Sequence, residues 1–149
     1  MDWEIDFGKR LKASQSASIQ RVSIYLADTN RRDEPIDLTH WVDRCVHLFV
    51  DLNDGCTRLP LAFGAFRDQD GSIFEHTVVV YSYITDPRRF HDRFNELVAF
   101  VHDFGRVTEQ KAVMVEFAGG SMGSYFSRAY FVGADDFIDF EATEDRLEA

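Results

Sequence analysis

The sequence has few residues that bind metals or form disulfides, and it has no long apolar run. Cys45 and Cys56 lie in no C-x-x-C motif, and the five histidines form no pair at i, i+4 spacing. Zinc sites usually show such spacings, so we predict no metal and no cofactor. No segment approaches the roughly 20 apolar residues of a membrane span, and the charged start MDWEIDFGKR does not resemble a signal peptide. We therefore expect a cytoplasmic protein that does not bind a membrane.

Basic residues are also scarce. The 16 Lys and Arg residues stand against 26 Asp and Glu residues, which gives a net charge of −10. Proteins bind nucleic acid nonspecifically through clustered Lys and Arg side chains that neutralise phosphates. We therefore expect no direct binding of nucleic acid. The C-terminal segment is especially acidic, and we interpret residues 135–149 as an acidic tail.

Apolar residues are numerous enough for one core, since 45% of the 149 residues are hydrophobic. Trp3, Phe7 and Leu11 recur at helical spacing and precede a run of Ser, Ala and Gln. We interpret residues 1–19 as an N-terminal arm and residues 20–134 as a single domain.

The patterns in this domain alternate between the period of a strand and that of a helix. The predicted elements are a strand over 20–28, a helix from Asp37 or Thr39 to residue 52, strands over 56–67 and 73–85, a helix over 87–105, and strands over 111–118 and 124–132. Asp86 followed by Pro87 marks the start of the second helix. This order predicts an α+β, ferredoxin-like βαββαβ fold, with two helices on one face of an antiparallel sheet and an added C-terminal strand.

The strand period also predicts which face of the sheet the helices leave open. The helix-covered residues are expected to be Val22, Ile24, Leu26, Val78, Val80, Val113, Val115 and Phe117. The open face is expected to carry Ser23, Tyr25, Glu75, Thr77, Val79, Tyr81, Tyr83, Met114 and Glu116. A bare aromatic face is a poor surface for a monomer, so we predict a homodimer formed through it.

Candidate functional residues lie on this open face and at its rim. The predicted ligand-binding residues are Tyr25, Thr57, Arg67, Glu75, Tyr81, Tyr83, Gln110 and Lys111. The tyrosines can stack on a ligand, and the Thr, Arg, Gln and Lys side chains can donate hydrogen bonds to anionic groups. Glu75 and Glu116 are candidate catalytic carboxylates that could share a proton if their strands are neighbours.

Gly119, Ser121 and Gly123 match the G-x-S-x-G motif of hydrolases, but the motif needs a following helix and a later histidine. A strand is predicted instead, and the last histidine is His102. We therefore predict that Ser121 is not a nucleophile.

A spaced pattern of single residues resembles that of small uncharacterised bacterial and phage α+β domains. The pattern is carried by Gly55-Cys56-Thr57, Gly64-Ala65-Phe66-Arg67, Asp70-Gly71, Glu75 and Glu109-Gln110-Lys111-Ala112-Val113. The resemblance spans roughly residues 20–118 and implies a ferredoxin-like fold. These domains have no established activity that the resemblance could imply for this chain. The resemblance does suggest a phage or mobile-element protein that antagonises host defence.

Three functions are compatible with these observations. The favoured one is a non-enzymatic domain that binds a small anionic ligand, such as a nucleotide. The first alternative is an interaction module whose acidic surface covers a basic site on a partner protein. The second alternative is an enzyme that uses Glu75 or Glu116 in acid–base chemistry.

Overall fold

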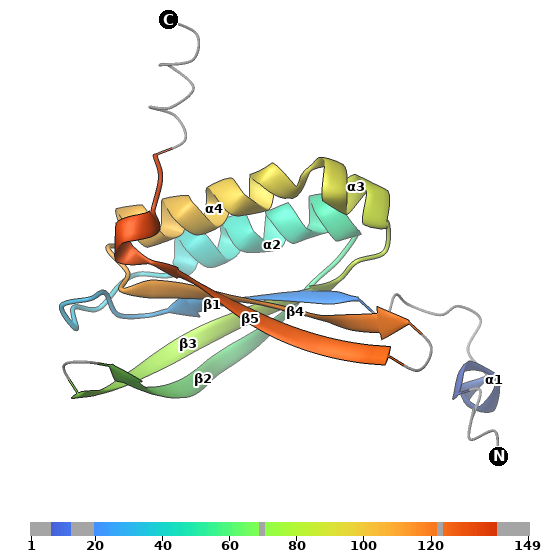
Figure 1. Ribbon diagram of the computed structural model, residues 1–149, viewed down its shortest axis with the longest axis horizontal. Helices are drawn as coiled ribbons and strands as arrows, with labels where there is room; N and C mark the ends of the chain where they lie inside the picture. The colour runs from blue at the N-terminus through green and yellow to red at the C-terminus, as the bar shows by residue number, and fades with distance from the viewer. Residues whose placement is uncertain (1–6, 13–19, 69–70, 122–123, 140–149) are drawn as a thin grey trace, which may run out of the picture.

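A computed structural model describes residues 7–12, 20–68, 71–121 and 124–139 (Figure 1). Its elements are α1 (Phe7–Leu11), β1 (Arg21–Ala27), α2 (Thr39–Asn53), β2 (Thr57–Asp68), β3 (Gly71–Tyr83), α3 (Pro87–Asp92), α4 (Phe94–Val107), β4 (Ala112–Ser121), β5 (Ser124–Gly133) and the short 3-10 helix η1 (Ala134–Asp136). None of the helices described is long and apolar enough to cross a membrane.

The five strands form one antiparallel sheet in the order β2-β3-β1-β4-β5. β1 lies in the middle of the sheet, and β2 and β5 are its edges. The longer helices α2 and α4 cover the same face (Figure 1). The molecule is therefore an α+β protein with a five-stranded antiparallel sheet, which is consistent with the predicted ferredoxin-like arrangement.

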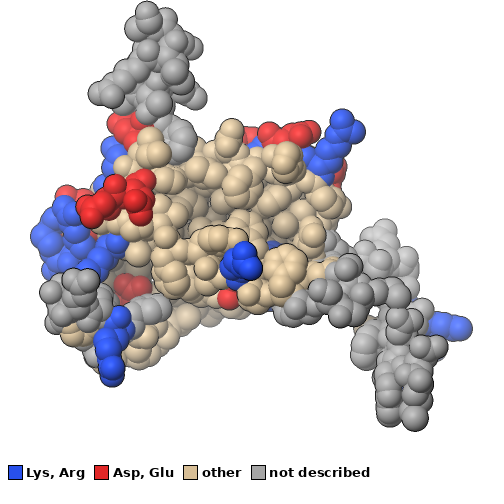
Figure 2. Space-filling model, viewed as in Figure 1, with Lys and Arg blue, Asp and Glu red and all other residues tan. Residues whose placement is uncertain are grey.

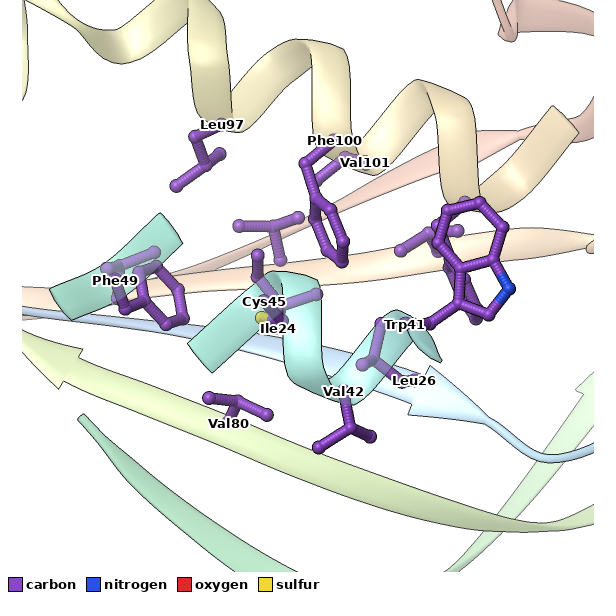
Figure 3. Close-up of a cluster of buried hydrophobic side chains, with 14 of the residues drawn as sticks. Ile24, Leu26, Trp41, Val42, Cys45, Phe49, Val80, Leu97, Phe100 and Val101 are labelled. Carbon is purple, nitrogen blue, oxygen red and sulfur yellow. The ribbon is translucent and has the colours of Figure 1, made fainter. Parts of the chain in front are cut away.

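The core lies between the sheet and these two helices (Figure 3). Seven of the eight strand residues predicted to face the helices are buried, with exposed fractions of 0% for Val22 and Ile24 and 5% for Val115, and the eighth, Phe117, is partly buried and packs against the core. The helices contribute Trp41, Val42, Cys45, Phe49, Leu97, Phe100 and Val101. The period-2 prediction of the helix-covered face is confirmed for β1, β3 and β4.

The predicted helix over 87–105 begins as expected but is divided. The Asp86 side chain accepts a hydrogen bond from the Arg89 N–H at 3.0 Å, and Pro87 occupies the first turn. At Arg93 the backbone leaves the helical region, with φ −107° and ψ 13°, and α4 starts at the next residue. No glycine or proline marks this break, so the apolar stripe predicted one continuous helix.

The segment after β5 packs against α4. The Ile138 N–H donates a hydrogen bond to Nδ1 of His102 at 3.0 Å, and the rings of Phe137 and His102 meet edge to face. The Phe137 ring also lies so close to the backbone of Gly105 that a Cβ there would overlap it. Residues 137 and 138 of the predicted acidic tail thus contact the domain, whereas residues 140–149 lie outside the described residues.

We predict that Gly105→Ala destabilises the protein through Phe137 alone. Overpacking costs about 1–3 kcal/mol, whereas alanine favours a helix over glycine by about 1 kcal/mol. A net loss of up to about 2 kcal/mol is expected in urea unfolding of the single variant. In a Phe137→Ala background, where the ring is absent, Gly105→Ala should be neutral or stabilising. Equal losses in both backgrounds would contradict the proposed overlap.

Candidate functional site

The open face of the sheet brings several predicted site residues into one row. The register places Thr57 opposite Tyr81, Tyr81 opposite Ser23, and Ser23 opposite Glu116, across four neighbouring strands. Tyr83 lies one row further out on the same face, where its ring centroid is 6.1 Å from that of Tyr81. These residues form a polar and aromatic cluster at one end of the face.

Tyr25 lies on the same face, one row from this cluster, and its side chain is hydrogen-bonded to Glu116. Partial burial raises the pKa of Tyr25, and the Glu116 carboxylate raises it further. The Arg21 guanidinium stacks on the Tyr81 ring, 5.4 Å from its centroid. The Tyr25 hydroxyl therefore keeps its proton and donates a hydrogen bond to the Glu116 carboxylate.

Glu75 lies at the other end of the open face, in the middle of the β2–β3 hairpin. Its side chain is half-buried, and the residue opposite it on β2 is Gly64. Burial raises the pKa of Glu75 above its ordinary value, and the nearby Asp28 carboxylate adds to the rise. Within the described residues, no Lys, Arg or His side chain forms an ion pair with Glu75. The result is a partly desolvated carboxylate beside a residue that has no side chain.

A β-bulge produces this placement. The register of β2 with β3 shifts by one residue between Leu59, opposite Val79, and Ala62, opposite Thr77. Continuing the first register would place Phe63 opposite Glu75, whereas the bulge places Gly64 there and turns Phe63 toward the helix side. Bulges are frequent beside active sites, where they re-aim side chains. Pro60 within an edge strand is the sequence signal that could have revealed it.

Glu75 and Glu116 do not meet the condition for sharing a proton, which was that their strands be neighbours. β1 lies between β3 and β4, so their strands are not neighbours. Glu116 shares a row with Tyr81, which lies six residues from Glu75, or roughly 20 Å along the strand. The two carboxylates therefore cannot share a proton.

The predicted polar rim is not assembled around the open face either. Arg67 pairs with Ser72, which is three residues from Glu75 on β3. Because successive side chains of a strand alternate between its faces, Arg67 and Glu75 lie on different faces of the hairpin. Gln110 is buried and donates hydrogen bonds to the Thr29 carbonyl at 3.2 Å and to the Thr108 hydroxyl at 3.1 Å. It therefore closes a turn of the backbone. Lys111 is exposed next to it, just before β4.

The open face is also less bare than predicted. Ser23, Thr77 and Val79 are nearly buried there, and of the five apolar or aromatic residues predicted to form the dimer contact only Tyr83 is strongly exposed, at 44%. The homodimer stays a prediction. Large exposed apolar residues instead lie on the β2–β3 hairpin and on β5.

Ser121 is the last residue of β4 and pairs with Ser124 at the start of β5. A strand thus follows it, as predicted, and no helix is present to form a nucleophile elbow. Across the described ranges, no group of three His, Cys, Asp or Glu residues is placed to hold a metal ion.

The sequence matches no protein-family model and no curated protein. Two solved structures share its fold. A phage SAM lyase in complex with S-methyl-5'-thioadenosine is 14% identical, with a TM-score of 0.58 over 83% of this chain and 96% of that one. A phage SAM lyase in the apo state is 16% identical, with a TM-score of 0.55 over 82% of this chain and 94% of that one.

These comparisons correct the favoured functional hypothesis. The sequence favoured a non-enzymatic domain that binds a small anionic ligand, whereas the two solved structures are of a SAM lyase, which is an enzyme. The comparisons therefore contradict that hypothesis, and at 14% and 16% identity they show the likeness of the fold. The expected likeness to small phage α+β proteins agrees with the comparison at the level of the fold.

Proposed function

We propose that the chain is an enzyme that cleaves S-adenosylmethionine by a lyase reaction, with Glu75 as its acid–base residue. The observation that carries the proposal is Glu75 itself, a half-buried carboxylate of raised pKa held opposite a glycine. The shared fold supports it, because a phage SAM lyase matches most of both chains.

The substrate chemistry suits an isolated carboxylate. The sulfur of S-adenosylmethionine is a sulfonium cation, and its bond to the amino-acid chain breaks so that the bonding electrons return to sulfur as a neutral thioether. The thioether product is S-methyl-5'-thioadenosine. In an elimination, a base removes a proton from the carbon next to the one that leaves sulfur, and the electrons of that C–H bond form a C=C double bond in the amino-acid product. No water is added, and the proton needs an acceptor.

Glu75 can accept that proton. General bases work best when their pKa lies near the operating pH, and burial and Asp28 both raise the pKa of Glu75 in that direction. Its negative charge also lies where a sulfonium can be stabilised by electrostatic attraction in a partly desolvated setting. On the facing strand, Gly64 and Ala62 share the face of the carboxylate and have no side chain or only a methyl group.

We predict that the purified protein converts S-adenosylmethionine to S-methyl-5'-thioadenosine without any methyl acceptor. Liquid chromatography of timed samples measures both compounds, and their changes should be equal and opposite. S-Adenosylhomocysteine is the matched control, because it has the same adenosine but a neutral sulfur, and it should remain intact. If S-adenosylmethionine is not consumed above the rate of a heat-denatured sample, the proposed function is wrong.

A further inference from the structure

The segment that follows β5 returns to α4 and packs on it (Figure 1). It consists of η1 and residues 137–139, and we call residues 134–139 the strap. The Phe137 ring meets the His102 ring edge to face, with centroids 6.1 Å apart, and it covers the backbone of Gly105 further along the helix. The Phe137 side chain also packs against the hydrophobic core, so it is the main apolar contact of the strap.

One hydrogen bond of the strap depends on the protonation state of His102. The Ile138 N–H donates to Nδ1 of His102 at 3.0 Å. A ring nitrogen that accepts a hydrogen bond carries no hydrogen, so the hydrogen of the neutral ring lies on Nε2. In the protonated ring both nitrogens are donors, and Nδ1 can no longer accept. The bond between strap and helix therefore exists only while His102 is neutral.

The surroundings of the ring also favour its neutral form. Partial burial lowers the pKa of His102 below its ordinary value of 6.5, and the Asp136 carboxylate opposes this effect without cancelling it. The remaining charges near the ring are of both signs, as Figure 2 shows for this end of the molecule. The groups concerned are Asp103 and Arg106 on α4, Asp139 on the strap, and Arg128 and Tyr130 on β5.

We propose that the strap is a pH-sensitive switch, which is docked on α4 while His102 is neutral and is released when His102 gains a proton. Protonation turns the accepting nitrogen into a donor that faces the Ile138 N–H, and it places a charge beneath the Phe137 ring. His102 also lines the hollow of about 640 Å³ between α4 and β5. The same proton therefore adds a charge to the wall of a mainly apolar hollow.

Linkage gives the sign of the pH dependence. If docking of the strap lowers the affinity of His102 for a proton, a proton on His102 lowers the affinity of the strap for α4 by the same factor. A group with a lowered pKa contributes stability above its ordinary pKa, here 6.5, and loses it as the pH falls through the lowered value. The strap is therefore expected to be docked at neutral pH and released in mild acid.

A nuclear magnetic resonance titration of the His102 ring tests this linkage in the whole chain. Phe137→Ala removes the main apolar contact of the strap and should raise the measured pKa of His102 toward 6.5. Phe131→Ala is the matched control, because Phe131 is 60% exposed on β5 and pairs with Met114 away from the strap. This control should leave the pKa of His102 unchanged.

Hydrogen exchange of the Ile138 amide gives a second and independent measurement. Its protection factor, which corrects for the intrinsic pH dependence of exchange, should fall about tenfold between pH 7.5 and pH 5 in the wild type. The amide of Ile24, in the middle strand, reports any change in global stability and should not follow this fall. In His102→Gln, whose side chain does not titrate, the protection of Ile138 should be the same at both pH values.

Three results would overturn the proposal. An unchanged pKa of His102 in folded Phe137→Ala would show that the strap and the proton are not coupled. Parallel losses of protection at Ile138 and Ile24 would mean that acid unfolds the whole domain rather than the strap. A pH dependence at Ile138 that persists in His102→Gln would assign the effect to another group.

Discussion

Replacing Glu75 with glutamine is expected to slow the cleavage of S-adenosylmethionine by about 10²–10⁴-fold, the usual contribution of a positioned acid–base group. Glutamine keeps the size and the hydrogen-bonding capacity of the side chain, but it cannot accept a proton or attract a sulfonium by its charge. The initial rate of S-methyl-5'-thioadenosine formation measures the effect. Glu116→Gln is the matched control, because Glu116 lies at the other end of the open face in a hydrogen bond with Tyr25.

The stability of Glu75→Gln should behave differently from its activity. The folded protein raises the pKa of Glu75 above the ordinary value of 4.5, so the folded state holds this proton more tightly than the unfolded state does. The stability contributed by the group is therefore complete below pH 4.5 and is lost as the pH rises through the folded-state pKa. At neutral pH the glutamine variant avoids that loss and should be at least as stable as the wild type.

Urea unfolding at pH 4 and pH 7 separates the two roles of Glu75. A variant that lost both activity and stability at pH 7 would make Glu75 a structural residue. Loss of activity in Glu116→Gln to the same extent as in Glu75→Gln would show that the assay reports general damage to the sheet. Only the combination of lost activity with retained stability supports a catalytic role for Glu75.

The largest expected effect on stability is that of Phe104→Ala, which should lower the free energy of unfolding by about 3–5 kcal/mol. Phe104 is completely buried, its ring packs edge to face on Trp41 at 5.4 Å, and it stacks with Phe100 at 6.5 Å. Truncation removes these contacts and leaves a cavity between α2 and α4. Because domains are stable by only about 5–15 kcal/mol, the loss should be plain in urea unfolding curves.

Phe131→Ala provides the comparison for this prediction. Phe131 is 60% exposed on the edge strand β5, so the same chemical change should alter stability by only about 0.5 kcal/mol. A loss in Phe104→Ala no larger than that in Phe131→Ala would mean that the contact between the two helices contributes little to the core.

Local patterns in the sequence were sufficient to predict the core and most elements. Val22, Ile24 and Leu26 alternate with polar neighbours, and such a pattern gives the strand one apolar face. The break at Arg93 was not predictable, because neither a helix-breaking residue nor a change of period accompanies it. The sequence therefore predicts which face of each strand or helix is buried more clearly than it predicts where each helix ends.

The candidate site was predicted only in part, because it depends on which strands are neighbours. Glu75 was identified from its unusual position within an apolar strand, and the structure places it on the expected face. Glu116 was considered as its partner only because both residues are predicted on the open face of the sheet. In the observed strand order, β1 separates their strands. Asp28, which helps to raise the pKa of Glu75, lies just beyond β1 and is distant in sequence.

The bulge in β2 has a consequence for folding. A pairing without the bulge would differ from the observed one, beyond Leu59, by a slip of one residue. A straight pairing continued from Leu59 would place Phe63 opposite Glu75, on the same face as its carboxylate. The bulged pairing frees the carboxylate and presents the ring on the other side of the hairpin. A misregistered hairpin would therefore crowd the proposed catalytic carboxylate, so the proposed activity depends on one choice of register.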